Sequence, residues 1–305
     1  MLKATQSLDL SHPLQARRWI RVWREDRVSG IRLKEDLRLD PSELGFSFAA
    51  NGLGLRGTIR PTAPGVILGT SFAMGLAVND GENWWELLKH SGDWFNLALP
   101  VGLNEMRRLV ETYYLGEGDT LCFVYHPNLL QQCVMYERLA AANASPFKVF
   151  GWRTDLPGCL WLSARRLMRR WALVRKGEFM LVRRSNGLYL VDGRYCLMDL
   201  KRHSSTLARS AEVFGELLNR FKRVIILRAR IKQDLAVRDL NPPRFDLLEK
   251  NYEAMWSAFA SQINMHPNAK VLDTDHADWD WFHARDTHWN QKGNLEVALQ
   301  ISNAL

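Results

Sequence analysis

The chain has 305 residues, of which 47% are hydrophobic and 24% are charged, and it carries a net charge of +8. Its apolar runs fall short of the roughly 18 residues that a membrane span needs, and its first residues lack the apolar core of a secretory signal. The cysteines have no Cys-x-x-Cys spacing, which argues against a zinc knuckle or a dense disulfide framework. We therefore expect a soluble, cytoplasmic protein without a membrane span, with reduced and mostly buried thiols at Cys122, Cys133, Cys159 and Cys196.

Residues 1–60 are predicted to be a charge-rich leader that packs on the core, and they end in a pattern of three glycines, Gly52, Gly54 and Gly57. A Gly-x-Gly-x-x-Gly spacing occurs in dinucleotide-binding folds, where it leads directly into a helix whose N-terminus holds the pyrophosphate. Here Pro61 and Pro64 follow at once and interrupt such a helix. We interpret the glycines as turn residues.

From residue 65 onward, short apolar runs of the buried-strand type alternate with segments of helical periodicity. The pattern predicts strands over residues 66–68, 95–99, 120–125, 224–227 and 270–272. It predicts a helix that begins at 84–88 and further helices over 105–114, 213–221 and 247–263. A last helix is expected after Asn290, a good N-cap residue, with one apolar face that contains Leu295, Ala298, Leu299 and Leu305.

This alternation indicates an α/β fold in which helices cover both faces of a parallel sheet. We assign residues 61–145 and 206–305 to the core and residues 146–205 to a basic insertion. The insertion contains a predicted β-hairpin, with strands over 179–184 and 188–191 and a Ser-Asn-Gly turn at 185–187. In sheets of this kind the ligand crevice lies beyond the carboxyl ends of the strands.

The positive charge is concentrated in the insertion, because residues 165–202 hold eleven basic side chains against three acidic ones. Such a patch is either a solvated surface or a site for an anionic partner such as nucleic acid, a membrane surface or an acidic polysaccharide. It lacks the motifs and stacking aromatics of nucleic-acid-binding domains, so we expect no nucleic acid partner. Arg165 and Arg169 are candidates for contact with an anionic substrate.

Two segments at opposite ends of the chain supply the residue types of an acyl-transfer site. Ser71 follows the first predicted strand of the core, and Asp286 and His288 follow the last one. A serine hydroxyl needs a neutral imidazole to take its proton, and a carboxylate fixes the tautomer of that imidazole. We therefore expect a catalytic triad of Ser71, Asp286 and His288 at the carboxyl edge of the sheet. Candidate oxyanion donors are the backbone N–H groups of Ser71 and Gly102 and the side-chain amide of Asn128.

Residues 69–75 (GTSFAMG) and 286–293 (DTHWNQKG) resemble the first and last sequence blocks of the SGNH (GDSL-type) hydrolase superfamily of esterases and acyltransferases. The Gly-Thr-Ser variant and the Asp-Thr-His-Trp sequence are most similar to the alginate O-acetyltransferase-like branch, which acts on bacterial polysaccharides. The resemblance implies a three-layer α/β/α sandwich of flavodoxin-like type, without a metal or a cofactor. His126 and Trp289 are further candidates for contact with the substrate.

The chain departs from the family pattern at three places. Thr70 replaces the aspartate of the first block, which is not the catalytic base. In the second block, either Gly102 or Val101 aligns with the oxyanion position. In the third block, which is usually Gly-x-Asn-Asp, only Asn128 matches.

The sequence therefore predicts a serine-dependent ester hydrolase, acting through an acyl-serine intermediate on an O-acylated carbohydrate or another small ester. Two alternatives on the same fold stay open: an O-acyltransferase that moves an acetyl group to a polysaccharide, and a non-catalytic protein that binds an anionic glycan. A third hypothesis is a metallohydrolase, because imidazoles and carboxylates gather over residues 276–288. These candidate ligands are His276, Asp278, Asp280, His283, Asp286 and His288.

Overall fold

A computed structural model describes residues 22–40, 45–88, 93–144, 179–185, 187–192, 200–240, 246–284 and 286–305. At its centre is a five-stranded parallel sheet with the strand order β11-β10-β7-β5-β6. The strands are β5 (Gly65–Gly69), β6 (Trp94–Asn96), β7 (Thr120–Tyr125), β10 (Arg223–Arg228) and β11 (Ala269–Asp273). The predicted α/β class with a parallel sheet is confirmed.

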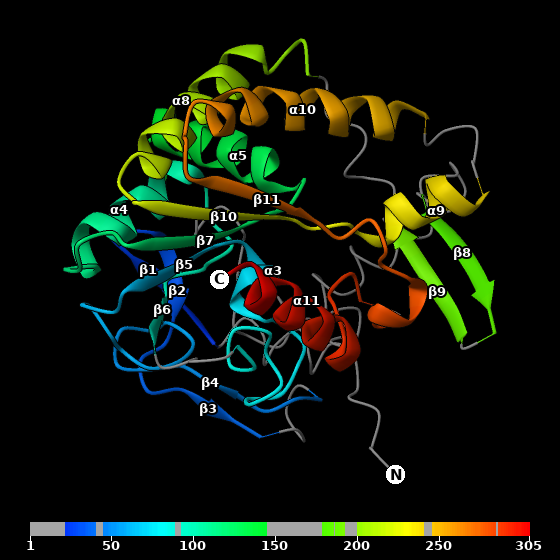
Figure 1. Ribbon diagram of the computed structural model, residues 1–305, viewed down its shortest axis with the longest axis horizontal. Coiled ribbons are helices and arrows are strands. Elements are labelled where there is room, and N and C mark those ends of the chain that lie inside the picture. Colours follow the sequence, from blue (N-terminus) through cyan, green and yellow to red (C-terminus); the bar gives the residue numbers. More distant parts are fainter. Residues whose placement is uncertain are drawn as a thin grey trace.

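The order of the strands determines where a ligand crevice can form. Counted along the chain, the five strands lie in the order 2-1-3-4-5: the chain passes from β5 to β6 on one side and then crosses back to β7 on the other side of β5 (Figure 1). In doubly wound sheets of this order the crevice lies beyond the carboxyl ends of the strands at that switch point. The loops at the switch point follow β5 and β7, the strands that precede Ser71 and Asn128.

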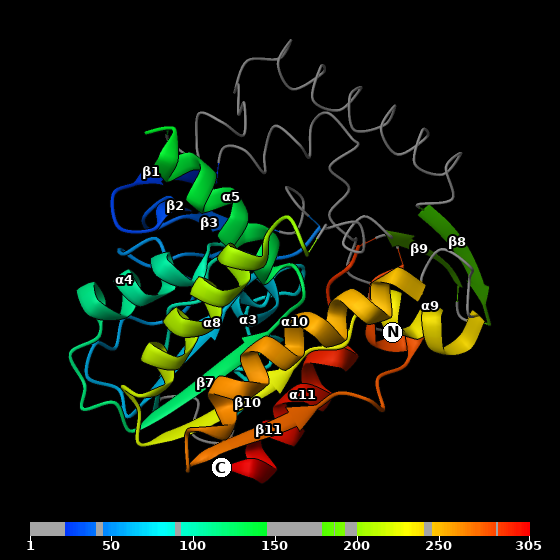
Figure 2. The same cartoon turned by 90° about the horizontal axis from the view of Figure 1, so that it is seen from above.

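Helices cover both faces of the sheet (Figure 1). One layer consists of α4 (Leu103–Tyr113), α5 (Leu129–Ala141), α8 (Ser204–Leu218) and α10 (Asp246–Asn264), and Figure 2 shows α8 and α10 in front of β7 and β10. The other face carries α3 (Ser71–Met74) and α11 (Gln291–Ala304), and α9 (Lys232–Leu240) lies beyond the carboxyl end of β10. Within the described residues, no helix is long and apolar enough to cross a membrane.

The strands form because their sequences are nearly continuous apolar runs. Every residue of β5, β6 and β7 is buried, and β10 buries its four central residues. Such runs are typical of parallel strands that have helices on both faces. The edge strand β11 is partly exposed.

Smaller β elements surround this core. Residues 22–49 contain two antiparallel pairs, β1 (Trp23–Asp26) with β2 (Gly30–Leu33) and β3 (Arg38–Leu39) with β4 (Phe48–Ala49). The hairpin predicted in the insertion is confirmed, since β8 (Phe179–Arg184) pairs with β9 (Gly187–Asp192). Most of the remaining insertion lies outside the described residues.

The glycine pattern near residue 55 is a turn region, as predicted. Gly54 and Gly57 have φ angles of 67° and 97°, in the left-handed region that favours glycine, and no helix follows them. Arg56 between them is 2% exposed and donates to Val78 O at 2.9 Å and to Asp80 Oδ1 at 2.8 Å. This buried guanidinium ties the N-terminal region to the loop that follows α3.

Residues 84–88 form turns, although the sequence predicted the start of a helix. The backbone N–H of Trp84 donates to the side chain of Asn294 at 3.1 Å, and its indole N–H donates to Phe72 O at 3.2 Å. These contacts hold the segment against α11 and α3, so tertiary packing outweighs local helical preference. Helix α8 also differs from its prediction, since it covers residues 204–218 instead of 213–221.

The predicted apolar face of α11 is wrong in part. Leu295 and Leu299 are 46% and 52% exposed, and Leu305 is exposed as well. The structure instead buries a neighbouring face with the helical spacing i, i+3, i+4 and i+7. That face consists of Asn294, Val297, Ala298 and Ile301. The predicted N-cap is confirmed, because the Asn290 side chain accepts the N–H of Gly293.

Gly69, the last residue of β5, lies two residues before Ser71 and has no room for a side chain. Its φ is 138°, and a Cβ atom there would lie 2.7 Å from Ala73 Cβ and 2.8 Å from Val124 O. We expect Gly69→Ala to lower the free energy of unfolding by about 3 kcal/mol, through backbone strain and overpacking together. Gly81→Ala is the control, because Gly81 has a φ of 86° but open space around it, and it should cost about 1 kcal/mol. Urea unfolding measures both variants, and equal losses would contradict the steric argument.

Candidate active site

Ser71 is the first residue of α3, two residues after the end of β5. The preceding residue, Thr70, is the N-cap of α3 and is fully buried in an extended conformation. The short helix ends at Gly75, which has a left-handed φ of 73°. From residue 65 to residue 78, Ser71 is the one residue that is partly exposed. A densely buried segment therefore presents a single hydroxyl at the carboxyl edge of the sheet.

Asp286 and His288 belong to the loop between β11 and α11. The loop first forms the 3-10 helix η3 (Trp279–Trp281). It then folds back on itself through an antiparallel bridge between Phe282 and Trp289. Within this bridge the N–H of His283 donates to His288 O at 3.2 Å. The two expected site residues therefore lie in a short closed loop.

The structure brings the three predicted triad side chains together. His288 Nε2 lies 2.7 Å from Ser71 Oγ, and His288 Nδ1 is hydrogen bonded to Asp286 Oδ1. The same carboxylate oxygen accepts the backbone N–H of His288 at 2.8 Å. Because an ionised carboxylate only accepts hydrogen bonds, the proton of the neutral imidazole is assigned to Nδ1 and the lone pair of Nε2 faces the hydroxyl. This is the arrangement in which an imidazole can take a proton from serine.

Asp286 is held in its ionised form. Burial by itself raises the pKa of this carboxyl group, but the charge and the hydrogen bonds of His288 outweigh that effect and keep the pKa well below its usual range. The side chains of Asp286 and His288 are only 10% and 13% exposed. A carboxylate that stays charged in such a dry environment stabilises a positive charge on the neighbouring ring.

Phe72, which the sequence did not single out, is the centre of the aromatic packing at the site. Its ring lies 5.0 Å from the ring of His288, 4.4 Å from that of His126 and 4.8 Å from that of Trp289. The residue next to Ser71 thus restrains the face of the His288 ring. A residue of this kind is indistinguishable from an ordinary core phenylalanine in the sequence, because its partners are distant along the chain.

His126 and Trp289 were expected to contact the substrate, and the structure corrects this expectation. Their exposed fractions are 2% and 1%, so neither ring offers a surface to a ligand. His126 Nδ1 instead lies 2.6 Å from Asn128 Oδ1, within hydrogen-bond distance. Both residues are therefore part of the buried packing around Phe72.

Gly102 and Asn128, the candidate oxyanion donors, lie at the beginnings of helices. Gly102 is the N-cap of α4, which follows β6, and Asn128 is the N-cap of α5, which follows β7. Since β6 and β7 both pair with β5, these residues follow the strands on either side of the one that leads to Ser71. The N–H of Val101, the alternative in the second block, donates to Leu99 O at 2.8 Å, which favours Gly102 as the free donor.

Several expected residues fall outside the part of the chain that the structure describes. Arg165 and Arg169 are among them, as are Cys159 and Cys196. The other two cysteines, Cys122 and Cys133, are free thiols in the core, as expected. Burial raises the pKa of both thiols, that of Cys133 to about 11.

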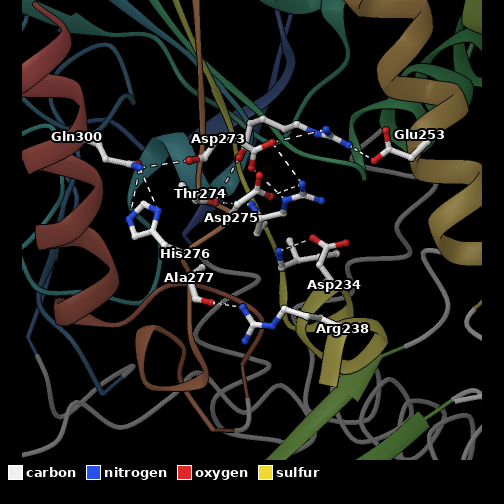
Figure 3. Close-up of polar contacts among 12 residues, drawn as sticks. Asp234, Arg238, Glu253, Asp273, Thr274, Asp275, His276, Ala277 and Gln300 are labelled. Carbon is white, nitrogen blue, oxygen red and sulfur yellow. Dashed lines mark hydrogen bonds and ion pairs between the residues drawn. The ribbon is translucent and has the colours of Figure 1, made fainter. Parts of the chain in front are cut away.

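A network of charged groups lies at the carboxyl ends of β10 and β11, before η3 (Figure 3). Arg230 pairs with Asp273, with 3.0 Å between Nε and Oδ1, and also with Asp275. Arg238 of α9 donates to Ala277 O at 3.0 Å. The basic residues here are matched by carboxylates and carbonyls of residues 273–277, so the network holds the chain before η3 and not the bridged segment that carries Asp286 and His288.

The imidazoles and carboxylates of residues 276–288 do not converge on one centre. In the described part of the chain, no group of three His, Cys, Asp or Glu side chains is arranged to hold a metal ion. Asp278 caps η3 by accepting the N–H of Trp279 at 2.6 Å, and Asp280 pairs with Lys292 at 2.5 Å. These carboxylates have structural partners of their own.

No protein-family model matches the chain, and no curated protein matches it in sequence. The resemblance of the serine and histidine segments to SGNH blocks therefore stays a prediction. The evidence for a function is the arrangement of side chains around Ser71.

The burial of His126 predicts a specific dependence of stability on pH. Burial lowers the pKa of this ring to about 3, whereas in the unfolded chain the ring gains a proton near pH 6.5. Between these values the unfolded state binds more protons, so the contribution of neutral His126 is complete above about pH 6.5 and is lost as the pH falls toward about 3. In urea unfolding from pH 6.5 to 4, we expect stability to fall more steeply for the native chain than for His126→Asn, by up to roughly 1.4 kcal/mol per pH unit. Parallel slopes would show that the ring is protonated in the folded state.

Proposed function

We propose that this protein is a serine-dependent ester hydrolase that acts through an acyl-Ser71 intermediate. The observation that carries the proposal is the chain of contacts from Asp286 through His288 to Ser71, with 2.7 Å between His288 Nε2 and Ser71 Oγ. A carboxylate, an imidazole and a hydroxyl in this sequence of hydrogen bonds are the groups that acyl transfer by serine requires. The partial exposure of Ser71, in a segment over residues 65–78 that is otherwise buried, supports its role as the nucleophile.

In the first half-reaction, His288 Nε2 accepts the hydroxyl proton while Ser71 Oγ attacks the carbonyl carbon of the ester. The bond from that carbon to the alcohol oxygen then breaks, and the departing oxygen takes the proton from His288. Asp286 holds the Nδ1–H group throughout and stabilises the imidazolium that exists between these two transfers. The products are a free alcohol and an ester between the acyl group and Ser71.

In the second half-reaction, His288 removes a proton from water, whose oxygen attacks the acyl carbon. Ser71 Oγ leaves and regains a proton from His288, so the net reaction adds one water across the ester bond. If a sugar hydroxyl takes the place of water, the same steps transfer the acyl group to the sugar, which is the O-acyltransferase alternative. Product analysis with and without an added polysaccharide separates the two reactions.

The tetrahedral intermediates carry an oxyanion that needs hydrogen-bond donors. We assign this role to the backbone N–H groups of Ser71 and Gly102 and to the side-chain amide of Asn128. His126 Nδ1 lies 2.6 Å from Asn128 Oδ1 and accepts the backbone N–H of Asn128 at 3.1 Å, so this buried ring holds Asn128 in place at the start of α5. One donor of this kind contributes about 3–4 kcal/mol to transition-state stabilisation.

We further propose that the substrate is an O-acylated carbohydrate or a small ester. The excess of basic side chains over residues 165–202 supports an anionic partner, since a concentrated positive patch attracts one. Residues 69–75 and 286–293 are similar to blocks of the alginate O-acetyltransferase-like branch, which acts on polysaccharides, and this similarity also supports a carbohydrate substrate.

Replacing the nucleophile tests the proposal directly. Ser71→Ala is expected to reduce hydrolysis of a small aryl acetate to the background rate, because the new side chain has no oxygen to acylate. In the native chain, mass spectrometry after treatment with a serine-directed phosphonate should find the adduct on Ser71. Ser257→Ala, which removes an exposed hydroxyl from α10, should behave like the native chain. The proposal fails if the native chain gives neither hydrolysis nor adduct, or if Ser71→Ala keeps both.

Replacing the carboxylate tests the role of the imidazole. Asp286→Asn is expected to lower kcat by about 10³- to 10⁴-fold with little change in KM, because a neutral amide neither fixes the Nδ1–H tautomer nor stabilises the imidazolium. Asp280→Asn is the control, since Asp280 lies in the same loop and pairs with the half-exposed Lys292. Steady-state kinetics measure both variants, and similar kcat values for the two would argue against the assignment of Asp286.

A further inference from the structure

Lys232, the first residue of α9, is fully buried although its side chain is basic. Its ammonium group donates to two successive backbone carbonyls, His283 O at 2.9 Å and Ala284 O at 3.2 Å. Moving a charged group out of water costs several kcal/mol unless polar groups replace the water. The two carbonyl dipoles provide part of this replacement.

These carbonyls belong to the loop that carries Asp286 and His288. The bridge between Phe282 and Trp289 closes the loop at its base. Lys232 binds the two residues that follow Phe282, on the way to Asp286. The loop is therefore held at its base by strand-like pairing and along its outgoing side by a buried cation.

The β8–β9 hairpin lies against the same lysine. Lys232 Nζ is 5.7 Å from the centre of the Tyr189 ring, and that ring is 5.3 Å from the ring of Trp279 in η3. The indole N–H of Trp279 donates to Asp239 Oδ2 at 2.7 Å, and Arg184 of β8 pairs with the same oxygen at 2.9 Å. Lys232 is thus surrounded by side chains of α9, η3 and the hairpin, which contact one another.

We infer that Lys232 is a positioning residue for the candidate triad: by binding the carbonyls of His283 and Ala284, it sets the path of the loop so that His288 reaches Ser71. The catalytic consequence rests on the proposed function, whereas the effect on the loop does not. Displacing a catalytic group by about 1 Å can cost 100-fold in rate. Ser71 directly follows a core strand, whereas His288 lies in a loop. A displacement of one residue relative to the other is therefore expected from movement of the loop.

The side chain of His283 supports this assignment. Its ring is 6% exposed, and burial lowers its pKa; the positive charge of Lys232 acts in the same direction, and Asp286 acts against both. Burial and the charge of Lys232 therefore both favour the neutral form of His283. Lys232 therefore acts on the loop backbone through two hydrogen bonds and on the His283 ring through its positive charge.

The experiment compares Lys232→Met with Arg238→Met in the full chain. Methionine keeps the apolar stem and removes the charge and the donors. Arg238 is a matched control, because it also lies on α9 and donates to a carbonyl of the β11–α11 loop, Ala277 O, but before η3 (Figure 3). One measurement is the saturation kinetics of phosphonate labelling. The other is the low-field proton NMR signal of His288 Nδ1–H, identified by its loss in His288→Ala, which needs neither substrate nor turnover.

We expect Lys232→Met to slow the labelling step by about 10- to 100-fold, with the half-saturating phosphonate concentration unchanged. The low-field signal should shift or disappear, and Arg238→Met should match the native chain in both measurements. Native labelling and a native signal in a folded Lys232→Met variant would overturn the inference. A native chain that is not labelled at Ser71 would instead count against the proposed function, and the NMR comparison would still decide the role of Lys232.

Circular dichroism and urea unfolding establish whether each variant is folded. If Lys232→Met does not fold, Lys232→Gln takes its place, because it keeps an N–H donor at a shorter reach without the charge. The inference then requires slower labelling and a shifted His288 signal, and native values for both would overturn it.

Discussion

The hydrogen bond between His288 and Ser71 joins residues that are 217 positions apart, and the site exists only if the core brings them together. A parallel sheet does so, because β5 and β11 run in the same direction and the loops after them open at the same edge. The strands are not neighbours, since β7 and β10 lie between them. At a spacing of roughly 4.8 Å per strand, the loop after β11 spans about 14 Å across the sheet edge. The long segment over residues 274–290 provides this reach.

The two partners of that bond are fixed by different forces. Ser71 is held by packing, because the strand before it and the rest of α3 after it are buried and Gly69 has no room for a side chain. His288 is held by polar contacts, through Asp286, the bridge at Trp289 and the buried Lys232. Packing in a core is lost only when the core unfolds, whereas loops open locally at lower cost in free energy. The geometry of the site therefore depends most on the polar supports of the loop.

The sequence predicted the sheet because buried parallel strands are continuous apolar runs, and it predicted the triad because the three residue types follow the ends of such runs. It missed α9, since residues 232–240 (KQDLAVRDL) mix charges with few apolar positions and the helix is stabilised by its neighbours. It assigned His126 to the substrate because burial cannot be read from a lone histidine beside a strand end. The roles of Phe72 and Lys232 were invisible for the same reason: each depends on partners far away in the chain.

Residues 126–129 show how a candidate oxyanion donor, Asn128, is supported in the same manner as His288. The SGNH pattern that the sequence resembles has glycine where this chain has His126, and the His126 ring packs beside Phe72 and contacts the Asn128 side chain. Asn128 is thus held in place by a buried aromatic ring, just as His288 is oriented by contacts that lead back to a buried Lys232. Both supporting residues are polar and buried in the core. A buried polar group costs free energy unless its partner is in place, so each of them also penalises any conformation in which the residue it holds has moved.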